Sequence, residues 1–504
     1  MSFFVTTPIY YVNGAPHLGH AYTTIAADVL ARHHRQRGED VFFLTGTDEH
    51  GEPIALAAEK QGKSPQALAD ENAERFKALA PQLAATNDFF IRTTDPEHKA
   101  AVQEILTRVK ENGFVELGHW EGLYCPRCAD FKGADEIEEG DRCAIHHIEL
   151  TRESEENWFF KLSAFQERLE ALYAEQPEFV LPKERRNEAL AFIESGLRDI
   201  SLSRGAKLQW GVQVPWDPEH VFYVWFDALL NYATALTYAK PGEDLTAEFW
   251  PADVHIVGKD ILKFHCVYWP ALLMAAGMEV PRHVLVHGYL LMNAEKMSKS
   301  LGNVLDPFTI IERFGIDALR FYLLRDVQFG GDGEVSAEAF EQRYESELAN
   351  DLGNLASRVS AMVVKYRDGA VPATDALDLT ADFDGLPETV AAHLDRGELT
   401  QGLEQIWQRV RRLNRYVEEQ APWKLAKDDA LGAQLDTALA TLIEGLRTVT
   451  VLLAAYLPQT SSTLLAALGT KEDGWEAASF GAGPRVAQVE KLAPLFPKHD
   501  PAAA

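Results

Sequence analysis

Hydrophobic and polar positions in the first fifty residues follow the order of a β-α-β unit. Phe3 to Val5 begin an apolar strand, and Asn13-Gly14 marks a turn after it. From Leu18 to Leu30 the apolar positions recur at helical spacing, and Gly38 stands where a helix end favours glycine. Val41 to Leu44 then supply a second buried strand. Such a unit closes with a right-handed crossover, which predicts a parallel sheet.

The pattern changes between residues 113 and 212, where acidic runs and short irregular segments predominate. Strand-like runs return at Val254–Val257 and Val284–Val286, and we predict a helix between them over Asp260–Ala276. The prediction is therefore an α/β fold with one parallel sheet split by an inserted domain. Its first half spans 1–112, the insertion 113–212 and the second half 213–344.

Beyond residue 345 the chain is rich in Ala and Leu and poor in glycine as far as Leu468. This composition predicts a separate helix bundle over 345–504. No apolar run reaches the roughly 18 residues that a membrane span needs. The amino terminus also lacks the basic and then apolar order of a signal peptide, so we expect a cytoplasmic protein.

Charge limits the classes of partner that the chain can bind. The 504 residues carry 48 basic and 76 acidic side chains, a net charge of −28. This balance argues against a general polyanion binder, because such binding needs clustered Lys and Arg. A nucleic-acid partner held by a local basic strip stays compatible with an acidic surface.

His17-Leu18-Gly19-His20 lies between the first predicted strand and its helix. Ligands of parallel α/β sheets bind at this edge, and a helix N-terminus favours phosphate. Two imidazoles one turn apart can both donate to phosphate oxygens, and glycine lets a flat base approach the backbone. By composition an H-x-G-H pattern is expected about 0.03 times in this chain, so we interpret it as functional.

The segment Lys296-Met297-Ser298-Lys299-Ser300 places two lysines around small hydroxyl residues, before Gly302. Such a loop can clamp a triphosphate, since lysine supplies a compact charge to phosphate oxygens. A solvated basic loop would explain either lysine alone. It would not explain the combination with the histidine motif.

Three of the four cysteines fall within a short stretch of the insertion. Cys125-x2-Cys128 and Cys143-x2-His146 form two hooks of thiolate and imidazole ligands, which suit a tetrahedral structural Zn²⁺. Free buried thiols are the alternative. His147 is adjacent, but the Cys-x2-His spacing favours His146 as the fourth ligand.

The two signatures HLGH and KMSKS, separated by an insertion, resemble those of class I aminoacyl-tRNA synthetases. The flanking segments TTPIYYVNGAPHLGH, FLTGTDEHG, YVWFDALLNY, GKDILKFH and NEALAFI resemble methionyl-tRNA synthetases. The similarity covers nearly all of the chain. It implies a Rossmann-type catalytic domain split by a zinc-binding connective insertion, and an α-helical anticodon-binding domain over 345–504.

The resemblance implies that the chain activates L-methionine with ATP and Mg²⁺ and transfers it to tRNA(Met). His17, His20, Lys296 and Lys299 would be catalytic, and Gly19 and Ser298 would join them in binding ATP. Asp48 would pair with the methionine ammonium. The remaining methionine-binding residues would be Ile9, Tyr11, Trp225, Ala228, Tyr232, Ile261, Phe264 and His265. Taken singly, each of these aromatic residues is more often part of a core.

Four residues of the predicted bundle match family positions that read the anticodon: Asn354, Arg358, Pro422 and Trp423. Trp can stack on an unpaired base while Asn and Arg bond to its edges. The alternatives are a core position for Trp423 and a solvated helix face for Arg358. Because the chain ends soon after the bundle, we expect a monomer.

Two other functions are compatible with parts of this sequence. A small-molecule nucleotidylyltransferase can also use H-x-G-H, but it would need neither the cysteine hooks nor the bundle. A catalytically inactive relative that only binds tRNA would have lost signature residues, yet both histidines and both lysines are present.

Overall fold

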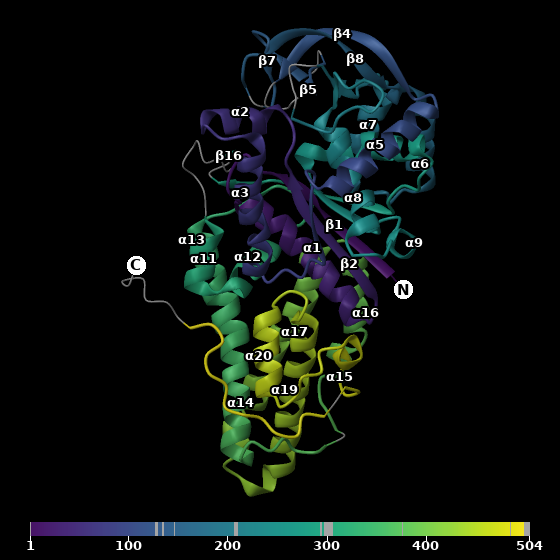
Figure 1. Ribbon diagram of the computed structural model, residues 1–504. Helices are drawn as coiled ribbons and strands as arrows, with labels where there is room; N and C mark the ends of the chain where they lie inside the picture. The colour runs from purple at the N-terminus through teal and green to yellow at the C-terminus, as the bar shows by residue number, and fades with distance from the viewer. Residues whose placement is uncertain are drawn as a thin grey trace.

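The computed structural model describes residues 2–125, 130–133, 136–145, 147–205, 210–292, 295–296, 306–374, 376–483 and 485–497. A six-stranded parallel sheet lies at its centre, in the order β3-β2-β1-β13-β14-β9 (Figure 1). Its strands are β1 (Ser2–Tyr11), β2 (Asp40–Asp48), β3 (Phe89–Arg92), β9 (Val180–Leu181), β13 (Val254–Gly258) and β14 (His283–His287). Strand β1 pairs with β2 on one side and β13 on the other, where Val5 meets Phe43 and Val254. The split parallel sheet is thus confirmed.

Successive side chains of β1 point to opposite faces of the sheet, and each face has its own helices. Phe3 and Val5 pack with α1 (Leu18–Gln36) and α12 (Ile316–Asp326). Phe4 packs on the other face with α5 (Pro96–Glu111), α8 (Val224–Tyr238) and α10 (Trp269–Ala276). The sheet is therefore apolar on both faces, as buried parallel sheets are.

The segment predicted as one helix over Asp260–Ala276 is three segments. A 3₁₀ turn over Lys259–Ile261 precedes a π-helix over Phe264–Tyr268, and α10 follows. Pro270 has no N–H to offer the carbonyl of Cys266 four residues earlier, and the Tyr173 hydroxyl donates to that carbonyl instead (2.9 Å). Apolar spacing alone does not distinguish these helix types, which explains the difference.

A four-stranded antiparallel sheet, in the order β10-β8-β4-β5, forms most of the inserted region. Its strands are β4 (Val115–Cys125), β5 (Asp130–Phe131), β8 (Thr151–Phe160) and β10 (Ile200–Ser201). A small hairpin of β6 (Ile137–Glu138) and β7 (Arg142–Cys143) lies beside it. In Figure 1 this region caps the central sheet at the top. Strand β9, although inside 113–212, pairs with β14 of the central sheet.

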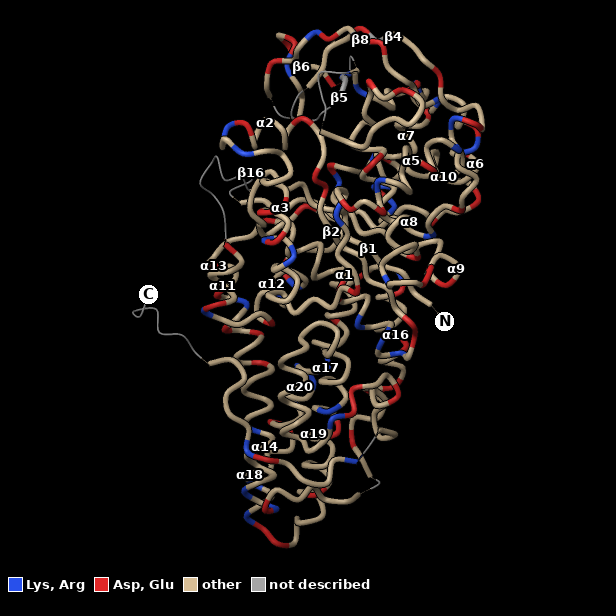
Figure 2. Tube along the Cα trace, in the orientation of Figure 1, with Lys and Arg blue, Asp and Glu red and all other residues tan. Residues whose placement is uncertain are grey.

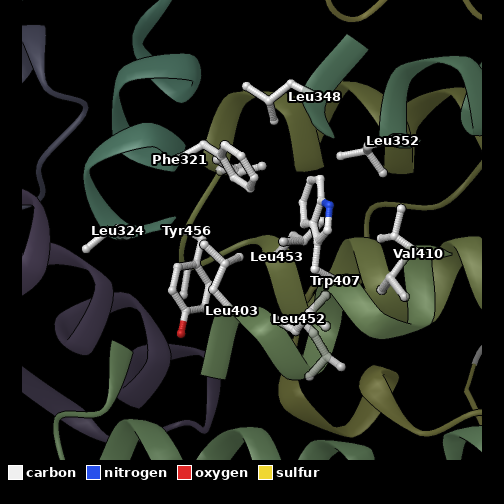
Figure 3. Packing of buried hydrophobic residues seen from close by; sticks show 14 of the residues in the cluster. Phe321, Leu324, Leu348, Leu352, Leu403, Trp407, Val410, Leu452, Leu453 and Tyr456 are labelled. Atoms are coloured by element: carbon white, nitrogen blue, oxygen red, sulfur yellow. The ribbon is translucent and has the colours of Figure 1, made fainter. Parts of the chain in front are cut away.

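The carboxyl-terminal part of the described chain is a helix bundle, at the bottom of Figure 1. Its main helices are α14 (Asn354–Arg367), α16 (Leu386–Asp395), α17 (Leu399–Gln420), α19 (Gly432–Leu453) and α20 (Pro458–Ala467). Trp407 of α17 packs on Phe321 of α12 with ring centroids 4.5 Å apart (Figure 3). This contact belongs to one continuous core that joins the bundle to the α/β domain.

A buried arginine also fixes the bundle to the α/β domain. Arg320 of α12 pairs with Asp28 of α1 (2.8 Å). It also donates to the carbonyl oxygens of Tyr456 (2.8 Å) and Ala455 (2.9 Å). Because a buried charge is tolerated only when it is paired, this network defines how α1 and the bundle are oriented. None of the described helices combines the length and hydropathy needed to cross a membrane.

Candidate active site

A cavity of about 730 Å³ opens at the carboxyl ends of the central strands. It is lined from β1, from the start of α1, from the end of β2 and from α8 and the π-helix. The structure brings twelve predicted site residues to this one cavity: Ile9, Tyr11, His17, Gly19, His20, Asp48, Trp225, Ala228, Tyr232, Ile261, Phe264 and His265. They come from segments up to 256 positions apart in the sequence, and folding brings these segments to one cavity.

The H-x-G-H motif forms the N-terminus of α1. His17 is the N-cap, and its Nδ1 accepts the backbone N–H of Gly19 (3.1 Å). His20 Nδ1 accepts the backbone N–H of His17 (3.1 Å), and the two rings stack with centroids 3.8 Å apart. Since Nδ1 is an acceptor in both rings, the proton of each neutral imidazole is on Nε2. The capping pattern therefore presents two Nε2–H donors at the positive end of the helix dipole.

Asp48, the last residue of β2, is buried in the cavity wall at 2% exposure. Burial, followed by the charge of Asp227, raises the pKa of Asp48 well above its usual value, although Tyr11 and the backbone at His50 lower it in part. No described residue gives a hydrogen bond to its Oδ1 atom. A buried carboxylate oxygen without a donor is costly, so this position suits a cationic ligand group.

The aromatic rings of Tyr11, Trp225 and Phe264 line the same cavity as Asp48, and we call this part of the cavity the slot. Trp225 and Phe264 stack with centroids 3.7 Å apart, and Tyr11 meets Trp225 edge-on at 6.1 Å. Both partners of the stack lie on helices, α8 and the π-helix, which hold them rigidly. A slot of aromatic edges and faces suits an unbranched thioether chain.

His265 is neutral in this slot. Burial lowers its pKa to about 4. Its Nδ1 donates to the carbonyl oxygen of Ile261 (3.0 Å), so Nε2 accepts from the Tyr232 hydroxyl (2.8 Å). The two side chains thus satisfy each other's hydrogen-bonding capacity within the cavity wall.

The second signature is only partly within the described residues. Lys296 belongs to β16 (Glu295–Lys296), which pairs with β15 (Leu290–Met292) next to the cavity-lining segment 287–290. Ser298 and Lys299 lie outside the described residues. Their roles in ATP binding stay predictions.

Two of the four predicted zinc ligands lie together. Cys125 ends β4 and Cys143 ends β7, and both are buried in one small cluster with Leu150. Cys128 and His146 lie outside the described residues. The neighbouring His147 is exposed, and its Nδ1 is 2.9 Å from Glu138 Oε2. Within the described chain no group of three metal-binding side chains occurs, and zinc stays a prediction.

The predicted anticodon residues lie in the bundle, on α14 and on α18 (Pro422–Leu425). The Arg358 guanidinium lies over the Trp423 ring at 5.7 Å and pairs with Glu418 (2.7 Å). Asn354 is exposed at the start of α14, whereas Pro422 is buried. Figure 2 shows Lys and Arg segments beside α14 and α18, in the lower part of the helix bundle. The structure therefore brings Arg358 and Trp423 together, and Asn354 precedes Arg358 by one helical turn on α14.

Sequence reasoning missed several residues at this cavity. Thr23 and His287 link α1 to the end of β14 through a 2.8 Å hydrogen bond. Lys132 of the insertion and Lys263 of the α/β domain both line the cavity, and each is 3.2 Å from Glu136 Oε1. No motif signals the Thr23–His287 and Lys263–Glu136 pairs, since each joins segments more than 100 positions apart; Lys132 and Glu136 are four positions apart.

The structure combines a split parallel sheet, an H-x-G-H motif at the first helix, an amino-acid slot beside that motif and an appended helix bundle. This is the architecture of a class I aminoacyl-tRNA synthetase. The family profile "tRNA synthetases class I (M)" matches residues 3–360. The profile "Anticodon binding domain of methionyl tRNA ligase" matches residues 368–490.

Individual relatives agree with these profiles. The methionine–tRNA ligase of Streptomyces coelicolor is 47% identical, over 99% of this chain and 96% of its own length. The methionine–tRNA ligase of Caldanaerobacter subterraneus is 43% identical, over 99% of this chain and 79% of its own length. A structure of Mycobacterium tuberculosis methionyl-tRNA synthetase in complex with methionyl-adenylate is 40% identical, with a TM-score of 0.94, and the match covers 99% of this chain and all of the other.

The chain therefore belongs to the methionyl-tRNA synthetases, the methionine–tRNA ligases of class I. This confirms the predicted fold class, reaction and partners: methionine, ATP and tRNA(Met). Enzymes of this family use ATP together with Mg²⁺.

Proposed function

We propose that the cavity binds methionine with its ammonium on Asp48 and its side chain against the rings of Tyr11, Trp225 and Phe264. One observation supports this assignment most directly: a buried carboxylate oxygen without a donor faces the same cavity as the stacked aromatic slot. Discrimination then comes from the shape of the slot, where one methylene contributes about 1–3 kcal/mol.

ATP binds at the other end of the cavity, with its phosphates at the N-terminus of α1. In this arrangement a methionine carboxylate oxygen attacks the α-phosphorus, the bond to the β-phosphate breaks and pyrophosphate leaves. The Nε2–H groups of His17 and His20 donate to the phosphate oxygens, where negative charge develops. Lys296, Ser298 and Lys299 complete the ATP contacts, and Mg²⁺ accompanies ATP. Little covalent chemistry falls to the protein; positioning and electrostatics carry the rate.

In the second half-reaction the terminal 2′-hydroxyl of tRNA attacks the carbonyl carbon of the adenylate. The new ester bond forms, the bond to phosphate breaks, AMP leaves and the hydroxyl proton is released. Trp423 stacks on an anticodon base, and Arg358, Asn354 and Pro422 complete that contact. The cation–π pair of Arg358 and Trp423 supports this role, because it holds the indole beside a positive charge.

Zn²⁺ in the insertion would be structural. Two buried thiols that end neighbouring strands fit a thiolate-rich tetrahedral site, and Cys128 and His146 would complete it. Such a site would fold the small β6–β7 hairpin, which has few apolar side chains of its own. We further propose that the enzyme is a monomer and works in the cytoplasm, where translation takes place.

Aminoacylation of a tRNA(Met) transcript tests this function. We expect charging with methionine, and a transcript whose CAU anticodon is replaced should be charged far less efficiently. Equal charging of both transcripts would refute the anticodon assignment, and no charging of either would refute the proposed reaction.

A further inference from the structure

A buried carboxylate outside the cavity wall connects three elements behind the methionine slot. Asp227 lies on α8 with no exposed surface, and it accepts two imidazole N–H groups. His50 Nδ1 is 2.5 Å from its Oδ2, and His98 Nε2 is 2.8 Å from its Oδ1. None of the three lines the cavity, so none is placed to touch substrate.

The network ties the slot to its carboxylate. His50 follows Asp48 by two residues, and His98 lies in the first turn of α5. The second ring nitrogen of His98, Nδ1, is 2.7 Å from Thr234 Oγ1, also on α8. Helix α8 is therefore fixed at two points to the end of β2 and to α5. A helix held in this way keeps its slot residues at a constant distance from Asp48.

Asp227 also acts on Asp48 through charge. Burial alone would raise the pKa of Asp227, but the charges and hydrogen bonds of His50 and His98 lower it to about 2. Asp227 is thus ionised at any working pH, and its negative charge helps to raise the pKa of Asp48. The titratable groups that face these two carboxylates are Tyr11 on β1, Glu49 and His50 after β2, His98 on α5 and Tyr232 on α8.

We propose that Asp227, clamped between His50 and His98, is a positioning residue for methionine that aligns α8 with Asp48 and sets the electrostatic environment of that carboxylate. This inference rests on the proposed binding of methionine at Asp48. Asp227 contributes in two opposite ways. Its clamp holds α8 and Trp225 beside Asp48, which favours binding, and its charge makes Asp48 harder to ionise at low pH.

The Asp227→Asn variant separates these effects. The dissociation constant of methionine, measured without ATP by the fluorescence change of Trp225, should rise about 10-fold at pH 7.5, because α8 loses the carboxylate that fixes it to His50 and His98. The pH below which binding weakens should move down by roughly one unit, because Asp48 no longer faces a like charge.

A purely structural role predicts weaker binding with an unmoved acid limb, and that result would overturn the proposal, as would unchanged binding at pH 7.5. The matched control is Asp317→Asn, which changes another buried helix carboxylate that accepts a backbone N–H, from Thr460 (2.6 Å). It should leave both the affinity and the acid limb unchanged.

If Asp227→Asn does not fold, two variants of His50 provide a second test. His50→Asn retains a donor where Nδ1 stands, whereas His50→Ala removes it. We expect methionine affinity close to wild type in the first and at least 5-fold lower in the second. Equal affinities in the two variants would overturn the proposal. Failure of the wild-type enzyme to bind methionine at all would instead refute the function on which the inference rests.

Discussion

Replacing Asp48 with asparagine removes the charge that the methionine ammonium is expected to meet. Asp48 is 2% exposed, so its pair with the ammonium is desolvated. Removing one partner of a buried charge pair costs about 2–5 kcal/mol, which corresponds to roughly 30- to 4,000-fold in affinity. Burial and Asp227 raise the pKa of this carboxyl. Part of the free energy that it gains from pairing with the ammonium therefore only offsets the cost of ionising it. We therefore expect the lower half of that range, about 100-fold.

The assay is the KM for methionine in ATP–pyrophosphate exchange, with the KM for ATP expected to change less than about 3-fold. The variant should bind methionine more weakly, but its folded state should be more stable. A carboxyl whose pKa is raised in the folded state favours folding only while protonated, and that contribution is lost as pH rises through the folded-state pKa. Asparagine removes this cost at pH 7.5, so the thermal unfolding midpoint should rise, as in other stability–function trade-offs.

Asp40→Asn provides the matched control, since Asp40 begins the same strand β2 and is exposed. It should leave the methionine KM and the unfolding midpoint unchanged. The reasoning is refuted if Asp48→Asn changes the methionine KM less than about 3-fold, or if its loss of activity comes with a lower unfolding midpoint.

Three further predictions address the other parts of the enzyme. His20→Asn keeps an acceptor for the helix cap but loses the Nε2 donor, so kcat for exchange should fall about 100-fold with an unchanged circular dichroism spectrum; an unchanged kcat would exclude the phosphate role. We expect elemental analysis to find zinc in the wild type and in Cys266→Ala, whose changed residue lies in the remote core, but not in Cys125→Ser; equal metal contents in the three proteins would contradict the proposed site. Trp423→Ala should raise the KM for tRNA roughly 5- to 150-fold through lost base stacking and leave exchange unchanged; a parallel fall in exchange would contradict a role limited to tRNA.

Features that depend on neighbouring residues were predictable from the sequence. The helix that starts at Leu18 follows from apolar spacing and from the turn before it, and Gly38 ends it at a φ of +78°, which favours glycine. The position of Asp48 at a strand end follows from the apolar run before it. The individual methionine-slot residues came from family resemblance, since an aromatic residue such as Phe264 has the same local pattern in a core.

Features that depend on distant contacts were not predictable. Asp227 follows His50 by 177 positions and His98 by 129 positions. No local sequence pattern relates these three residues. Within the π-helix, the carbonyl oxygen of Cys266 accepts a hydrogen bond from the Tyr173 hydroxyl, 93 positions earlier in the chain. Both features emerge only when the strands and helices pack.

The central claim is that this cavity activates methionine, and ATP–pyrophosphate exchange with purified protein tests it most directly. The assay compares methionine with leucine, isoleucine, valine and cysteine under identical conditions. We predict exchange that depends on methionine, with the other four amino acids at least about 100-fold less effective, as two or more unfavourable slot contacts would produce. Folded protein that shows no exchange with methionine, or equal exchange with leucine, would contradict the account.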